Sequence, residues 1–139
     1  MCYKGKFSQV RIGAHGIIIV YDITCRNSFF AVDDLMKELK KHSPKYSVKI
    51  LFGNKCDLEA EREVIYEEGK EMASKYGMSF LEISAKTSHN VDKAFMLLTK
   101  EAKNKVESGL LDPIPPPNKT ERAVFKPAEQ NLSCGCVCF

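Results

Sequence analysis

The chain has 139 residues, a formal net charge of +3 and a hydrophobic content of 44%, values typical of one soluble domain with a modest core. Its apolar runs are too short to span a bilayer, and its start lacks the charged-then-apolar pattern of a signal peptide, so we expect a chain of cytosolic origin. Because the charges are nearly balanced, there is no concentrated basic face for nucleic acid, and we expect no nucleic-acid partner.

The first part of the chain predicts one strand and one helix. Residues 1–10 have no clear periodicity and indicate a weakly ordered start. Residues 16–22 form a short apolar, β-branched run that is typical of a buried strand. Residues 28–41 place apolar side chains at helical spacing, and Ser43-Pro44 is a signal for the end of that helix.

Two more pairs of a strand and a helix follow along the chain. Residues 48–53 and 79–83 predict short buried strands, whereas residues 62–76 and 90–106 predict helices. Gly77 is placed to end the earlier of these helices as a left-handed cap. Such alternation of strands and helices predicts an α/β fold with a parallel sheet and right-handed crossovers.

Polar segments directly follow the second and third predicted strands, where the loops of α/β proteins bind ligands. The residues that we expect to form a pocket for a guanine base are Asn54, Lys55, Asp57, Ser84, Ala85 and Lys86. A carboxylate such as Asp57 can accept two adjacent N–H bonds from guanine, a pair of donors that adenine lacks. The backbone N–H of Ala85 can donate to the guanine carbonyl oxygen, and the Lys55 stem can lie across the base with its ammonium in water. Asn54 can then tie the two loops together.

From about residue 11 to 106 the chain resembles small GTPases of the Ras superfamily, and specifically the Rab branch. The resemblance is carried by residues 13–24 (GAHGIIIVYDIT), by the two base-binding segments, and by residues 90–95 (NVDKAF). It implies a partial P-loop GTPase-type fold, α/β, with three parallel strands alternating with three helices and the first half of the fold absent. It also implies GTP or GDP as ligand and a role in intracellular vesicle and protein transport.

The phosphate-binding part of such a GTPase has no counterpart in the sequence. No G-x-x-x-x-G-K-[ST] occurs to hold phosphates and magnesium. The base contacts alone support a dissociation constant on the order of millimolar. We therefore expect weak nucleotide binding, no magnesium site or other metal site, no catalytic residues and no GTP hydrolysis by this amino-terminally truncated chain. Judged by its family resemblance alone, the chain would be expected to hydrolyse GTP as an enzyme.

The missing first half also has a structural consequence for residues 16–22. The resemblance implies a neighbouring strand there, so we expect one backbone edge of this strand to be exposed. Exposed apolar edges favour self-association.

The composition changes at residue 107, and five of the six prolines fall between Pro113 and Pro127. Proline-rich stretches favour extended, solvated conformations. We therefore divide the chain into a GTPase-like domain, residues 1–106, and a flexible tail, residues 107–139.

Three cysteines in the last six positions indicate lipid attachment: Cys134, Cys136 and Cys138. Residues 136–139 (CVCF) fit a C-a-a-X prenylation signal. Stable anchoring requires two lipids or an additional basic patch, and the tail is close to neutral. The modified pair is either Cys134 with Cys136, as in the paired-cysteine ends of Rab proteins, or Cys136 with Cys138. Zinc is disfavoured because no second cysteine pair or histidine lies nearby.

Three functions are compatible with the sequence. The first is a Rab-like guanine-nucleotide protein, anchored by prenyl groups to the cytosolic face of an intracellular membrane or the plasma membrane, with the prenylation machinery and traffic effectors as partners. The second is a non-hydrolysing, lipid-anchored interaction module. The third is a non-functional truncated isoform. His15, His42 and His89 each lie alone at an element boundary, and we assign them no catalytic or metal-binding role.

Overall fold

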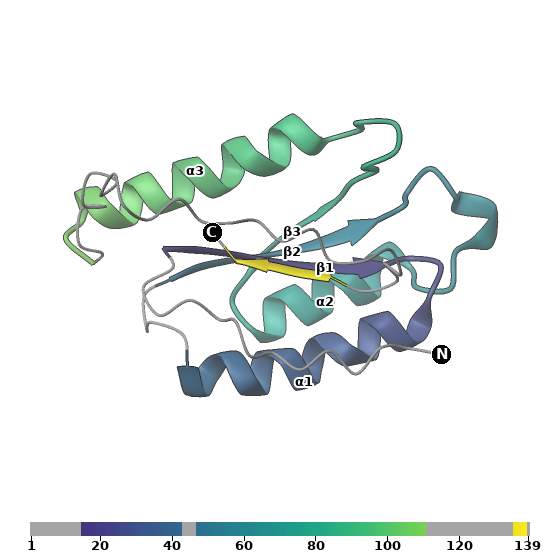
Figure 1. The fold of residues 1–139 in the computed structure, drawn as a ribbon, viewed down its shortest axis with the longest axis horizontal. Helices are drawn as coiled ribbons and strands as arrows, with labels where there is room; N and C mark the ends of the chain where they lie inside the picture. Colours follow the sequence, from purple (N-terminus) through teal and green to yellow (C-terminus); the bar gives the residue numbers. More distant parts are fainter. Residues whose placement is uncertain (1–14, 43–46, 111–134, 139) are drawn as a thin grey trace, which may run out of the picture.

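One sheet with helices on both faces makes up the computed structural model, which describes residues 15–42, 47–110 and 135–138 (Figure 1). In chain order the elements are β1 (Gly16–Asp22), α1 (Arg26–His42), β2 (Val48–Asn54), the 3-10 turn η1 (Glu59–Glu61), α2 (Tyr66–Lys75), β3 (Ser79–Glu82), α3 (Val91–Glu107) and β4 (Gly135–Cys138). None of these helices is both long and apolar enough to cross a membrane.

The sheet has the strand order β3-β2-β1-β4. β1 and β2 are parallel over seven residue pairs, from Gly16 opposite Val48 to Asp22 opposite Asn54, and β3 is parallel to β2. The predicted α/β fold with three parallel strands and three helices is therefore confirmed. This register brings the carboxyl ends of the three strands to the same end of the sheet.

The free edge that we expected on β1 is occupied in the structure. β4 pairs with β1 in the antiparallel direction, with Ile17 opposite Cys138 and Val20 opposite Gly135 (Figure 1). The expectation of a bare edge is thus wrong for residues 17–20. Antiparallel edge strands on otherwise parallel sheets are common, because they need no crossover helix.

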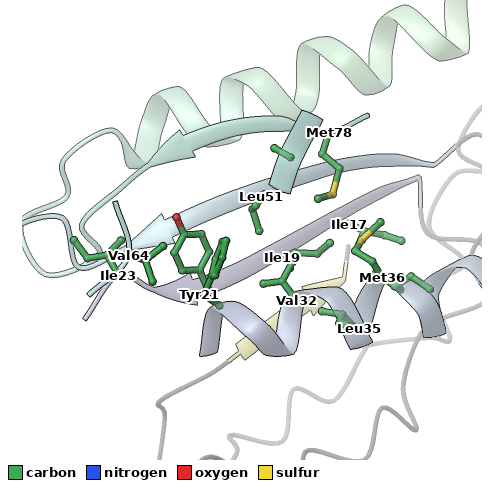
Figure 2. Packing of buried hydrophobic residues seen from close by; sticks show 13 residues of the cluster. Ile17, Ile19, Tyr21, Ile23, Val32, Leu35, Met36, Leu51, Val64 and Met78 are labelled. Carbon is green, nitrogen blue, oxygen red and sulfur yellow. The ribbon is translucent and has the colours of Figure 1, made fainter. Parts of the chain in front are cut away.

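Side chains of β1 alternate between two apolar layers. Ile17, Ile19 and Tyr21 face α1, as Figure 2 shows, and share an apolar layer with Ala73 of α2; each of the three is at most 1% exposed. On the other face Ile18 packs with Ile50 beneath α3. Since burial of one such side chain contributes about 1.5–3 kcal/mol, this strand is a main source of the fold's stability.

Two helices begin at least two residues away from their predicted starts. α1 begins at Arg26, two residues before the predicted start, and α2 begins at Tyr66, four residues after it. The backbone N–H groups of Glu63 and Val64 donate to the Ile23 carbonyl, which holds this segment in an extended conformation against β1. Gly77 has φ +64° just after α2, which confirms the predicted left-handed cap.

Several predictions concern residues outside the described ranges. These are the weakly ordered start at residues 1–10, the helix stop at Ser43-Pro44, and most of the tail, including its prolines, Cys134 and Phe139.

Candidate functional site

The two predicted base-binding loops lie side by side at the carboxyl ends of β2 and β3. The N–H of Ile83 donates to the Gly53 carbonyl at 2.8 Å, and the N–H of Cys56 donates to the Ile83 carbonyl at 3.2 Å. These bonds continue the ladder between β2 and β3 beyond the last residues of the strands. As a result, residues 54–57 and 84–86, which are separated along the chain, form one surface.

Asn54 connects the two loops directly. Its side-chain oxygen accepts a hydrogen bond from the backbone N–H of Ala85 at 3.1 Å. The structure thus contains the tie that the sequence suggested for Asn54. In this arrangement the Ala85 N–H is engaged with Asn54, so it must change partner to donate to a ligand.

A buried serine orients the exposed carboxylate of the site. Ser84 is fully buried, and its hydroxyl donates to Asp57 Oδ1 at 2.5 Å while accepting from the N–H of Thr87 at 3.2 Å. The hydrogen bond from Ser84 lowers the pKa of Asp57 below its ordinary value. Asp57 is therefore a solvent-facing, ionised acceptor with a fixed direction, as recognition of two adjacent N–H donors requires.

Lys55 is held by an acid that the sequence analysis did not single out. Its backbone has φ +67°, and its ammonium lies 2.6 Å from Asp22 Oδ2. We expected this ammonium to lie in water, but in the structure it pairs with Asp22. The hydrogen bond with Asp22 raises the pKa of Lys55.

Asp22 closes β1 and is almost completely buried. Its Oδ1 accepts from the N–H of Thr24 at 2.8 Å and from the Thr24 hydroxyl at 2.7 Å. Burial opposes ionisation, but the hydrogen bonds from Lys55 and Thr24 outweigh it and lower the pKa of Asp22. A signal for Asp22 was present in the sequence, because it ends the first strand as Asn54 ends the second.

A tight turn completes the second loop. Ser88 and Asn90 have positive φ angles of 61° and 57°, and the N–H of Ser84 donates to the His89 carbonyl at 3.1 Å. The Asn90 side chain donates to the Glu82 carbonyl at 3.0 Å, which ties the start of α3 to the end of β3. Lys86 is exposed on this turn. His89 is also exposed and takes part through its backbone.

Of the predicted lipidation residues, the structure describes Cys136 and Cys138, and neither belongs to the two predicted base-binding loops. Cys136 and Cys138 belong to β4, whose neighbour is β1, whereas the base-binding loops follow β2 and β3. Two surface hollows also lie elsewhere: one between α2 and β3, around Tyr66 and Phe80, and one along α3. Within the described ranges, no group of three or more His, Cys, Asp or Glu side chains is placed to hold a metal ion.

Comparisons with known proteins agree with the fold. The model of the family described as "Ras family" matches residues 3–104. The chain is also 42% identical over 126 residues to Ras-related protein RIC1 from Oryza sativa subsp. japonica, and the match covers 88% of this chain. The chain spans 60% of the length of that relative. From the extent of the family match, we conclude that the chain belongs to the Ras family of small GTPases.

Proposed function

We propose that this chain is a Rab-like family member that recognises the guanine base of GTP or GDP through the loops after β2 and β3. The observation that carries the proposal is the contact between Ser84 and Asp57. It fixes an ionised carboxylate at the surface, where one carboxylate can accept both the ring N–H and the amino group of guanine. Adenine offers no such pair of donors.

Lys55 contributes to the same site through its position. The ion pair with Asp22 keeps its side chain over the carboxyl ends of β1 and β2, where its apolar stem can pack against one face of the base. Asn54 holds the second loop against the first through the hydrogen bond that its side-chain oxygen accepts from the Ala85 N–H. Each of these residues supports a base that is stacked on one side and hydrogen-bonded at its edge.

We further propose that these 139 residues bind nucleotide weakly and do not hydrolyse it. The sequence contains no G-x-x-x-x-G-K-[ST], so no residues correspond to a phosphate cradle or to its magnesium-binding hydroxyl. Hydrolysis of GTP depends on charge stabilisation at the phosphates, which the base loops do not provide. A dissociation constant on the order of millimolar is expected from base contacts alone.

Membrane anchoring forms the other half of the proposal. Isoprenyl groups on two of the three terminal cysteines would attach the chain to the cytosolic face of a membrane, where Rab-like proteins direct vesicle traffic. The supporting feature is the sequence of residues 134–139 (CGCVCF), with its C-a-a-X end. Two lipids are expected because one chain alone gives only marginal binding.

A second candidate function would need no phosphate-loop motif, and these 139 residues contain none. A lipid-anchored module that engages partners without any nucleotide would need the tail and the outer surface but not Asp57. It would partition into membranes to the same extent with and without guanine nucleotide.

Titration of the purified chain with guanosine and adenosine, followed by amide NMR, tests the guanine site. Wild type should bind guanosine about tenfold more tightly than adenosine, the ratio expected from one charge-assisted pair of hydrogen bonds. The variant Asp57→Asn should lose this preference, while Asp34→Asn, on the exposed side of α1, should retain it. Equal affinity of wild type for both nucleosides would contradict the guanine site and favour the nucleotide-independent module.

A further inference from the structure

The structure places residues 135–138, which include two of the terminal cysteines, at the edge of the sheet as β4. Gly135, Cys136, Val137 and Cys138 lie opposite Val20, Ile19, Ile18 and Ile17 of β1. In Figure 1 this strand, drawn in yellow, runs along the edge of β1 that β2 leaves open. Two segments more than a hundred positions apart in the sequence thus form one antiparallel ladder.

β1 is a strand that needs a neighbour on both sides. Its side chains at positions 17–19 are at most 3% exposed, and they enter apolar layers on both faces of the sheet. Unpaired backbone N–H and C=O groups between two such layers are costly. β2 satisfies one edge of β1, and β4 satisfies the other along residues 17–20.

The terminal segment suits this position chemically. Residues 134–139 contain no charged side chain, and their only β-branched residue, Val137, lies at the centre of the pairing opposite Ile18. A segment with lysine or glutamate here would carry charge to the border of the apolar layers. The same composition that predicts lipidation therefore also permits docking on β1.

We propose that the edge of β1 is a docking site for residues 135–138 of the same chain, and that lipid attachment at Cys136 or Cys138 requires this segment to leave the sheet. The second part rests on the lipid anchoring proposed above. In that reaction the cysteine sulfur bonds to C1 of an isoprenyl diphosphate, diphosphate leaves, and the thiol proton passes to solvent. An enzyme that encloses the thiol must also enclose its backbone, which β1 holds in the docked state.

The proposal predicts two exclusive states of the chain. In the docked state β1 is paired on both edges and the thiols are poor acceptors. In the lipidated state the segment is drawn to the membrane, and the edge of β1 becomes available to a strand of another protein. Lipidation would thereby expose an interaction surface at the same time as it anchors the chain.

Disulfide mapping tests the docking directly. Cross-strand partners lie within the distance that a disulfide spans, so Ile19→Cys should link to Cys136 within one chain under a glutathione redox buffer. The matched control is Ile18→Cys, one residue away at an equally buried position but in register with Val137. Peptide mapping should find the Ile19→Cys link to Cys136 at least about tenfold more often than any link from Ile18→Cys, because neighbouring strand positions face opposite sides.

Two outcomes of this mapping would overturn the docking. One is equal linking by both variants to all terminal cysteines, which indicates an undocked tail. The other is linking only between chains, which indicates that the edge is filled by a second copy. Circular dichroism of both variants should first establish that each retains the helix content of wild type.

A second experiment tests the coupling to lipidation. Two reactions are timed at Cys136 and Cys138: transfer from geranylgeranyl diphosphate by a protein prenyltransferase, and alkylation by iodoacetamide. Each is measured in the full chain and in a free peptide of residues 130–139. Both reactions should be at least about tenfold slower in the full chain, as expected for a segment that reacts only from an undocked state.

The outcomes separate this inference from the proposed function. Equal prenyl transfer to chain and peptide would overturn the exclusion of lipidation by docking. If alkylation of the chain is slow but neither the chain nor the peptide accepts a prenyl group, the proposed lipid anchoring is overturned. The docking would then stand on the disulfide result.

Discussion

At the residue scale, two aspartates show how this fold keeps carboxylates ionised near its surface. Asp57 is exposed and receives the hydroxyl of a buried serine, Ser84, whereas Asp22 is buried and receives donors from Lys55 and Thr24. In both cases the donor belongs to a different loop or a following turn. Ionisation of each acid therefore depends on the correct placement of a neighbouring segment.

Asp22 should make stability depend on acid pH. Its folded-state pKa is lowered, so its contribution is present above the ordinary aspartate range and is lost as the pH falls through the lowered folded-state value. The free energy of unfolding, measured with urea, should fall between about pH 7 and about pH 3 for both proteins. The fall should be larger for wild type than for Asp22→Asn. The control Asp34→Asn should keep the wild-type loss. An equal acid loss in wild type and Asp22→Asn would contradict the assignment.

Tyr21 has a buried hydroxyl without a hydrogen-bond partner among the described residues. An unsatisfied buried hydroxyl is destabilising, so Tyr21→Phe should raise the free energy of unfolding by about 1 kcal/mol. Chemical denaturation measures this change. A loss of stability of that size would instead show that the hydroxyl has a partner.

Gly69, a residue of α2, lies next to the Tyr21 hydroxyl. A Cβ at this position would overlap both the Tyr21 hydroxyl and the edge of the Phe80 ring. Gly69→Ala should therefore lower the free energy of unfolding by about 1–3 kcal/mol. In the Tyr21→Phe background the loss should shrink without vanishing, since the overlap with Phe80 remains. Denaturation of the single and double variants checks this, and an additive result would contradict the shared overlap.

At the element scale, the segment between η1 and α2 is fixed by an arginine. The Arg62 guanidinium donates to both carboxylate oxygens of Glu82 at 2.7 and 2.8 Å, and to the Val64 carbonyl at 2.9 Å. Arg62 and Glu82 are each only 13% exposed. This pair attaches the connection before α2 to the edge strand β3.

Removing that pair should loosen α2 from the sheet. Arg62→Met keeps the apolar stem but leaves the mostly buried Glu82 carboxylate unpaired, so the free energy of unfolding should fall by about 2–3 kcal/mol. Glu82→Gln keeps one acceptor for the guanidinium and should cost less. Thermal denaturation of both variants measures the difference, and a larger loss for Glu82→Gln would contradict this account.

The elements also show which features the sequence could predict. The three parallel strands were predicted to within a residue, because short β-branched runs have few alternative structures. The start of α2 was placed four residues too early, since the bonds from Glu63 and Val64 to Ile23 join distant segments. β4 was not predicted, because a four-residue strand exists only through its partner.

In the candidate site too, the sequence predicts what depends on strand order and misses what depends on contacts between distant segments. The placement of Asn54, Asp57 and Ser84 at one end of the sheet was predictable, because they lie at or just beyond the ends of strands that must meet in a parallel sheet. The pairing of Lys55 with Asp22 was not predicted, because it depends on the left-handed backbone at Lys55 and on side-chain directions that periodicity does not contain.

At the scale of the whole molecule, the predicted base-binding loops lie at one end of the sheet, whereas the cysteine-containing strand β4 forms one of its edges. The loops follow β2 and β3, whereas β4 closes the edge of β1. The proposed base recognition and the proposed lipid attachment therefore involve different strands. The chain spans 60% of the length of its rice relative, and its 139 residues contain the predicted base-binding segments and no phosphate-loop motif.

We propose that these residues recognise guanine without contacts to the phosphates. The most direct measurement compares the dissociation constants of guanosine and GDP for the purified chain in magnesium buffer. The account predicts that the two values agree within about twofold and lie on the order of millimolar, because only the base makes contacts. Binding of GDP more than about tenfold tighter than guanosine, the equivalent of at least one additional strong contact, would contradict it.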